Sequence, residues 1–190
     1  MGTAEERIDE LLRLLEDQGN GDYIGEAISQ LEHCLQAANL AKISNADNDT
    51  IVAALLHDVG QFIPQDTEAL LYNGEKVGRR GHEVIGANYL RSLGFNQKVC
   101  QLVEAHVIAK RYLCAVSPSY HSGLSPASQK SLVLQGGPFT PDEVEQFESD
   151  PLWREKVQLR KWDDEAKVPG MHSPDLRHYR SLMLDSLIRV

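Results

Sequence analysis

Four histidines and an aspartate in this 190-residue chain have the types and spacing of a metal site. The histidines follow one another at intervals of 24, 25 and 24 residues, and they are His33, His57, His82 and His106. Each lies in a different segment of helical pattern, and Asp58 directly follows His57. A bundle of such helices would bring one imidazole from each to a common centre. Imidazole nitrogens and carboxylate oxygens suit iron, zinc and manganese, so these residues indicate a metal site without naming the metal.

The alternative is that each histidine is a separate core residue whose ring bonds a backbone carbonyl, as a single buried imidazole commonly does. Leu55 and Leu56 directly precede His57 and place its ring toward a core. Several buried imidazoles without partners would be costly, so we favour a shared metal. The remaining histidines lie in loop-like or terminal segments and are predicted at the surface; they are His121, His172 and His178.

The segments that carry these residues have the apolar period and the end signals of helices. Helices are predicted over 5–16, 22–42, 50–58, 82–93, 96–114 and 153–167. Two further helices begin at cap-and-proline pairs, Ser125-Pro126 and Thr140-Pro141. Residues 63–81 and 117–126 are rich in turn-forming residues and are predicted as loops, and no run alternates as a strand would. The predicted fold class is therefore all-α.

Length and composition indicate an ordinary globular chain. Apolar residues make up 42% and charged residues 25%, and one domain over 1–190 is expected, with an N-terminal helix and loop (1–21) and a C-terminal tail helix (168–190). The net charge of -9 disfavours nucleic acid and anionic membrane surfaces as partners. No apolar run approaches the ~20 residues of a membrane span, and no signal sequence is visible, so we expect a cytoplasmic protein.

The histidine pattern resembles the HD-domain superfamily of metal-dependent proteins. One His, a His-Asp pair, two further His and a late Asp match His33, His57-Asp58, His82, His106 and Asp163. The resemblance implies an all-α HD-domain helical bundle with a di-metal site in its core. Seven stretches are similar, more narrowly, to the mixed-valence di-iron oxygenases of the superfamily, of the phosphonate-cleaving PhnZ type. They are 22–27, 31–33, 54–60, 82–83 with 86–90, 103–107, 109–113 and 159–167.

This resemblance implies a cofactor and its ligands. One iron would be bound by His33, His57, Asp58 and Asp163, and the second by Asp58, His82 and His106. Asp58 would therefore bridge the two metals. The implied cofactor is a pair of iron ions in the mixed-valence Fe(II)/Fe(III) state, and O2 is the implied co-substrate.

The resemblance also implies a small anionic phosphonate as the substrate. The expected reaction cleaves the C–P bond of 1-hydroxy-2-aminoethylphosphonate or its N-trimethyl congener, giving glycine or glycine betaine plus phosphate. Tyr23 matches a tyrosine that occupies an iron site before the substrate arrives, and Glu26 matches a glutamate that meets the substrate amine. Either a primary amine or a trimethylammonium group on the substrate would be attracted to Tyr23 and Glu26.

Further positions match those that hold the phosphonate, and they are Lys110, Ser128, Ser131 and Arg160. Gln61 is a departure, because it stands where the phosphonate-cleaving type has a second histidine. Helical spacing agrees with two of these assignments, since Lys110 is one turn after His106 and Arg160 is one turn before Asp163. If the predicted helix begins at Asp22, then Tyr23, Glu26 and His33 share one helical face.

Simpler roles compete with these assignments. Lys110 and Arg160 are alternatively surface charges, Ser128 a helix cap, and Tyr23 with Glu26 a half-exposed interface pair. The rival function is an HD-type metal-dependent phosphohydrolase of a nucleotide or small phosphate ester, which would use the same metal ligands. A regulatory HD domain that has lost its metal is the third class, and the intact ligand set argues against it. Consumption of O2 would distinguish the oxygenase from both.

Overall fold

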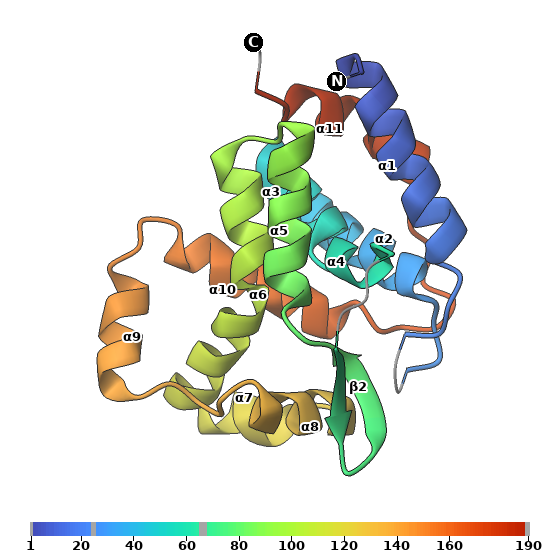
Figure 1. Cartoon of the computed structure of the whole chain (residues 1–190). Helices are drawn as coiled ribbons and strands as arrows, with labels where there is room; N and C mark the ends of the chain where they lie inside the picture. Colours follow the sequence, from blue (N-terminus) through green and yellow to red (C-terminus); the bar gives the residue numbers. More distant parts are fainter. Residues whose placement is uncertain (1, 24–25, 65–67, 189–190) are drawn as a thin grey trace.

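The computed structural model describes residues 2–23, 26–64 and 68–188, and in this part of the chain helices predominate (Figure 1). The helices are α1 (Ala4–Gln18), α2 (Gln30–Ile43), α3 (Asn48–Leu56), α4 (Val59–Phe62), α5 (His82–Leu93), α6 (Gln97–Val116), α7 (Pro118–Gly123), α8 (Pro126–Leu134), α9 (Pro141–Glu148), α10 (Trp153–Glu165) and α11 (Arg180–Asp185). A 3-10 turn, Leu176–Tyr179, precedes α11. The all-α prediction is confirmed.

Most helix starts follow their sequence signals. Ser125 caps α8 by accepting a hydrogen bond from the Ser128 backbone N–H, and Thr140 forms a capping box with Glu143 at the start of α9. Asn96 accepts a hydrogen bond from the Val99 backbone N–H and caps α6. Each of these side chains satisfies a backbone N–H that has no partner inside its helix.

The predicted helix over 22–42 begins later than expected, at Gln30. Ser29 and Glu32 form a capping box there, and Asp22 pairs with Ser29 across a turn. Because this box satisfies the backbone N–H groups of Ser29 and Glu32, the preceding residues are free to leave the helical path. Tyr23 and Glu26 therefore lie on a loop, and their predicted helical face shared with His33 is wrong. Ile24 and Gly25 of the same stretch lie outside the described residues.

The predicted loop over 63–81 contains an antiparallel hairpin, β1 (Ala69–Tyr72) and β2 (Glu75–Arg79), which the sequence analysis did not expect. Asn73 and Gly74 join the strands with φ of 50° and 85°. Two consecutive positive φ values match the twist of a two-residue hairpin turn, and Asn-Gly is the pair that tolerates them. The predicted loop over 117–126 is also partly wrong, because Ser117 caps α7 and Pro118 begins it.

The core is built around α3, which packs against α2, α6 and α10 (Figure 1). Every residue of α3 from Thr50 to Leu56 is buried, as its continuous apolar run requires. The next residues, His57 and Asp58, therefore emerge inside the bundle rather than at its surface. No helix of the described residues combines the length and hydropathy needed to span a membrane.

A close backbone approach at Gly60 fixes the position of α4 against α5. A Cβ atom at Gly60 would lie 1.9 Å from the His82 carbonyl oxygen and 2.9 Å from the Gly86 backbone nitrogen. Only glycine permits this approach, because any side chain would overlap the neighbouring backbone. The contact brings the start of α5, with His82, next to the end of α3, with Asp58.

We expect Gly60→Ala to separate α4 from α5. The free energy of unfolding should fall by about 1–3 kcal/mol, the usual effect of overpacking. Chemical denaturation of the purified protein measures this difference. Gly123→Ala is the matched control, because a Cβ there meets no atom within 4 Å. Equal stability of the two variants would contradict the assigned constraint at Gly60.

Candidate active site

The four predicted histidines and both predicted aspartates meet in the interior. His33 comes from α2, His57 and Asp58 from the junction of α3 and α4, and His82 from the first position of α5. His106 lies on α6 and Asp163 on α10. All six side chains are buried, with His33 and His57 fully enclosed. Helices that are distant in sequence therefore bring these six side chains to one centre.

Backbone carbonyls orient all four rings in the same way. The Nδ1 atoms of His33, His57, His82 and His106 lie 2.8, 2.8, 3.0 and 2.8 Å from the carbonyl oxygens of Ala166, Ala54, Arg79 and Val103, respectively. A carbonyl oxygen can only accept, so each Nδ1 carries a proton and donates it. In a neutral ring the other nitrogen, Nε2, then has a free lone pair.

These lone pairs point at one another. The Nε2 atoms of His33 and His57 are 2.9 Å apart, and those of His82 and His106 are also 2.9 Å apart. Burial lowers the pKa of His57, and burial together with the neighbouring His82 lowers that of His106 to about 3, so both rings are neutral near pH 7. Burial alone would lower the pKa of His82, but its hydrogen bond to Asp58 and the Asp58 charge outweigh burial and raise it. A cation beside each pair of Nε2 atoms would be shared by both lone pairs and would take the place of a proton between them.

The carboxylate oxygens complete two sets of metal donors. Asp58 Oδ2 lies 3.8 and 3.6 Å from the Nε2 atoms of His33 and His57, and Asp163 Oδ1 lies 3.3 and 3.8 Å from the same atoms. Asp58 Oδ1 lies 3.2 and 3.6 Å from the Nε2 atoms of His82 and His106. Donors about 2.0–2.2 Å from one ion lie roughly 2.8–4.4 Å from each other for angles between 90° and 180° at the ion, so both sets fit a metal. Asp58 belongs to both.

Electrostatics keeps both aspartates in the ligating form. Burial alone would raise the pKa of Asp58, but the surrounding imidazoles of His57, His82 and His106 outweigh burial and lower it. Burial would likewise raise the pKa of Asp163, and the Arg160 guanidinium with the nearby imidazoles holds it well below its ordinary value. Arg160 Nη1 donates to Asp163 Oδ2 over 2.8 Å, which leaves Oδ1 for a metal. Both groups are therefore carboxylates at neutral pH.

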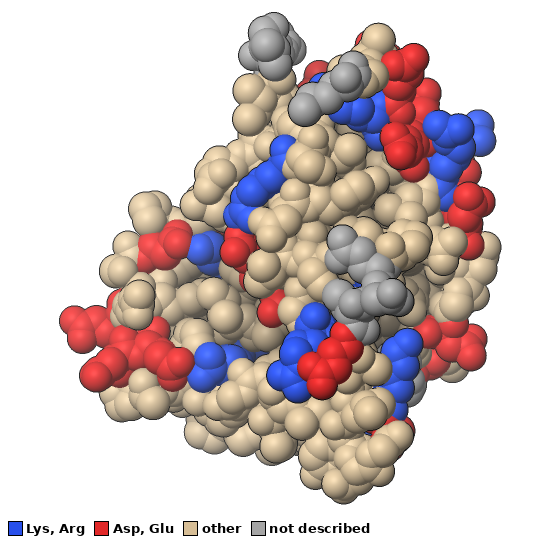
Figure 2. Space-filling model, viewed as in Figure 1, with Lys and Arg blue, Asp and Glu red and all other residues tan. Residues whose placement is uncertain are grey.

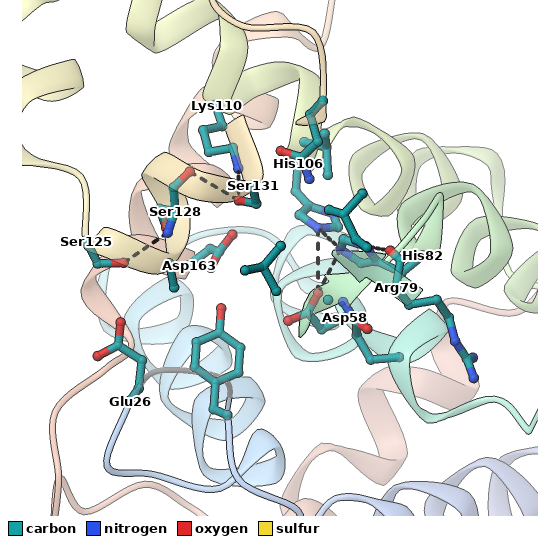
Figure 3. Close-up of a pocket in the computed structure, with 18 of the residues that line it drawn as sticks. Glu26, Asp58, Arg79, His82, His106, Lys110, Ser125, Ser128, Ser131 and Asp163 are labelled. Atoms are coloured by element: carbon teal, nitrogen blue, oxygen red, sulfur yellow. Dashed lines mark hydrogen bonds and ion pairs between the residues drawn. The ribbon is translucent and has the colours of Figure 1, made fainter. Parts of the chain in front are cut away.

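A cavity of about 90 Å³ opens beside the second donor set. Asp58, His82 and His106 line one side, and Lys110 with Ser128 and Ser131 of α8 face them across the cavity (Figure 3). Lys110 Nζ donates to Ser131 Oγ over 2.8 Å. Cations and hydroxyls therefore oppose the metal donors, an arrangement that suits an anionic group of a small ligand.

The predicted anion-binding residues are buried, which rules out their simpler roles. Lys110 is 2% and Arg160 5% exposed, so neither is a solvated surface charge. Ser128 is not the cap of α8, because Ser125 is. Burial, with a further contribution from the Arg160 charge, lowers the pKa of Lys110 to about 7. Gln61 also lines the cavity.

The cations of the cavity are local, because the chain as a whole is acidic. Figure 2 shows acidic side chains gathered along α1 and on α9, at the edges of the molecule. The acidic ends of α1 and α9 include Glu5, Glu6, Asp142 and Glu143. The net charge therefore describes the outer surface and not the cavity.

Tyr23 and Glu26 reach the cavity from the loop before α2. The Tyr23 ring stacks on the His33 imidazole with a centroid distance of 4.0 Å and an interplanar angle of 18°. Burial, helped by the Asp163 and Asp58 carboxylates, raises the pKa of the Tyr23 phenol well above its ordinary value. Glu26 Oε1 lies 4.0 Å from Lys167 Nζ. Both residues face the cavity, so the interface-pair alternative does not describe them.

Several lining residues were missed by the sequence analysis. Arg79 of β2, Gln135 after α8 and Lys167 after α10 all line the cavity. Asp164 holds Arg160 through Nη2 and Nε and accepts a hydrogen bond from the Tyr120 hydroxyl. The only available signal was proximity in sequence, because Asp164 directly follows the predicted ligand Asp163 and Lys167 lies four residues after it.

Comparisons with known proteins agree with this geometry. The sequence profile of the HD domain matches residues 31–135. The chain is 44% identical to the hydroxymethylphosphonate dioxygenase of Gimesia maris, over 94% of this chain and 87% of that protein. It is 36% identical to the glycine-betaine-forming 1-hydroxy-2-(trimethylamino)ethylphosphonate dioxygenase of Leisingera caerulea, over 90% of this chain and 85% of that protein. An uncharacterised protein of Acanthamoeba polyphaga mimivirus is 37% identical over 96% of this chain and 82% of its own length.

The shared position of Asp58 predicts different metal losses for two variants. Asp58→Ala should bind neither metal, whereas His106→Ala should lose one metal and keep the other in the set of His33, His57, Asp58 and Asp163. Metal content per chain, measured by elemental analysis after dialysis, tests this expectation. Full metal content in Asp58→Ala would exclude Asp58 as a shared ligand.

The low pKa of Lys110 predicts pH-dependent anion binding. Because this pKa is lowered to about 7, the charged form is present below pH 7 and is lost as the pH rises. Sulfate stays a dianion throughout, so its affinity for the metal-loaded protein should fall about tenfold from pH 6 to pH 8. Lys110→Met should bind sulfate about 10–100-fold more weakly at pH 6 and lose this pH slope, with metal content unchanged. Calorimetric titration measures both, and identical slopes would refute the role of Lys110.

Proposed function

Because this chain belongs to the HD-domain family and, within it, to the HD-type oxygenases, we propose that it uses O2 to cleave the C–P bond of a small 1-hydroxyphosphonate. One observation carries the proposal: a cavity is lined on one side by the metal donors Asp58, His82 and His106 and on the other by an anion-binding group of Lys110, Ser128 and Ser131. A substrate whose phosphonate is bound by Lys110, Ser128 and Ser131 would present its carbon to the metal donors.

The proposed cofactor is a mixed-valence pair of irons. His33, His57, Asp58 and Asp163 would hold one iron, and Asp58, His82 and His106 the other. When bound, the irons would supply the redox chemistry with O2. The donor set of imidazoles and carboxylates, with no thiolate, suits this choice. The hydrogen bonds from Nδ1 to the carbonyls would keep each ring in its ligating orientation.

The substrate anion would be bound by Lys110, Ser128, Ser131 and Arg160. Lys110 is already directed toward α8 by its bond to Ser131, so it needs no rearrangement to meet an anion. The Arg160 guanidinium is fixed by Asp163 and Asp164, which positions its remaining N–H groups beside the metal ligands. Burial of these groups excludes water and strengthens their interaction with the phosphonate.

Tyr23 and Glu26 would control access and recognise the rest of the substrate. Tyr23 covers His33, and we propose that its phenol leaves when the substrate enters. Glu26 would attract the amine of 1-hydroxy-2-aminoethylphosphonate or its trimethylammonium counterpart, in competition with Lys167. The products would be glycine or glycine betaine plus phosphate. Hydroxymethylphosphonate, named for the Gimesia maris relative, would leave Glu26 paired with Lys167 and would give formate.

The proposed reaction balances without another reductant. A 1-hydroxyphosphonate and one O2 contain the atoms of one carboxylic acid and one phosphoric acid. Cleavage of the C–P bond would therefore consume one O2 for each phosphate released. An HD-type phosphohydrolase with the same ligands would release phosphate without O2.

The decisive experiment follows O2 uptake and phosphate release together on the iron-loaded protein. The panel is hydroxymethylphosphonate, 2-amino-1-hydroxyethylphosphonate, its trimethylammonium analogue, and methylphosphonate as the unhydroxylated control. We expect equal amounts of O2 and phosphate with at least one hydroxyphosphonate and none with methylphosphonate. In the same assay, Tyr23→Phe should consume more O2 than it releases phosphate. Hydrolysis of phosphate esters without O2, and no turnover of the panel, would replace the proposal with the phosphohydrolase.

A further inference from the structure

One buried polar atom of the cavity has no partner. Gln135 lines the cavity directly after α8, and its side-chain oxygen, Oε1, is buried without a hydrogen bond to any described residue. The other described side-chain atoms in this condition belong to Arg7, Ser173 and Tyr179, none of which lines the cavity. Buried acceptors are nearly always satisfied, so an orphan beside a ligand cavity indicates a donor on the ligand.

The position of Gln135 identifies the part of the ligand that it faces. Its backbone N–H donates to the Ser131 carbonyl over 3.0 Å, so it lies one helical turn after Ser131. Ser131 in turn accepts the hydrogen bond from Lys110. Gln135 therefore lies on the side of the cavity that offers donors to an anion, and its side-chain amide brings a carbonyl acceptor to that side.

An acceptor in an anion site distinguishes anions that carry a proton from those that do not. A phosphonate or phosphate monoanion has a P–OH group, whereas sulfate and sulfonates have no proton near neutral pH. An amide oxygen can only accept, so it gains a bond from the first class and meets an oxygen lone pair of the second. A site built around such a bond rejects ligands that lack the donor.

We propose that Gln135 is a specificity-determining residue that accepts a hydrogen bond from the P–OH group, so that the cavity selects a monoanionic phosphonate over a sulfonate. This inference rests on the proposed function, because the proposed function is what names a phosphonate as the ligand. In this arrangement Lys110, Ser128 and Ser131 bind the charged oxygens of the phosphonate, and Gln135 binds its protonated oxygen.

The test compares inorganic phosphate with sulfate as ligands of the metal-loaded protein at pH 6, where phosphate is mainly the monoanion. Gln135→Leu should weaken phosphate binding about 10–100-fold and leave sulfate binding within about threefold, as measured by calorimetry. Gln135→Met, which keeps the side-chain length, should behave alike and guards against a folding defect. Gln129→Leu is the matched control on the same helix, because Gln129 is exposed and does not line the cavity.

Two results would overturn the inference. Equal weakening of phosphate and sulfate would mean that the carboxamide donates rather than accepts, and unchanged binding of both would mean that it meets neither anion. Gln135→Glu adds a further comparison. Its carboxylate still accepts a hydrogen bond from P–OH but repels both anions, so this variant should weaken sulfate binding more than phosphate binding. The assay needs no turnover: selective loss in Gln135→Leu with no C–P cleavage would remove the proposed function alone, and the reverse pattern would remove only this inference.

Discussion

Four hydrogen bonds from imidazole Nδ1 atoms to backbone carbonyls determine what the interior of this protein can bind. They fix one proton on the outer nitrogen of every ring and direct the four Nε2 atoms toward one another and toward the two aspartates. The alternative of separately satisfied core histidines is thus half true: each ring does bond a carbonyl, and that bond is what exposes the other nitrogen to a metal. Asp58 then connects the two pairs, since each of its oxygens faces one of them.

The clustering of the four histidines with Asp58 was predictable from the spacing of helical segments, whereas Asp163 was predicted only through the family resemblance. A histidine in each of four helical segments has few ways to be buried, and regular spacing with a His-Asp pair indicated one centre. Caps were equally readable, as Ser125 and Thr140 illustrate. The late start of α2 was readable too, because Ser29 and Glu32 have the spacing of a capping box, but the apolar period before them obscured it. Asn73-Gly74 is likewise a sequence signal for a hairpin turn.

The rest of the cavity depends on contacts between segments distant in sequence, which no local pattern encodes. Tyr23 stacks on His33 although the helix that was expected to carry both is broken between them. Lys110 meets Ser131 only because α8 packs beside α6. The orphan oxygen of Gln135 has no sequence signal at all, since it is defined by the absence of a neighbour among the described residues. The resemblance supplied several of these positions where physics from the sequence could not.

The hairpin separates two kinds of evolutionary constraint. Leu70, Val77 and Gly78 line the cavity, and Glu75 near the turn pairs with Lys130 on α8, yet neither strand contributes a metal donor. The helices must preserve six ligands and the close approach at Gly60, so they tolerate little change. Apart from Arg79, whose carbonyl oxygen accepts the hydrogen bond from His82, the hairpin must preserve a turn and a contact with α8. Substitutions there reshape the space around a substrate while the metal donors stay in place, so this element offers the fold a route to new substrates without the loss of its chemistry.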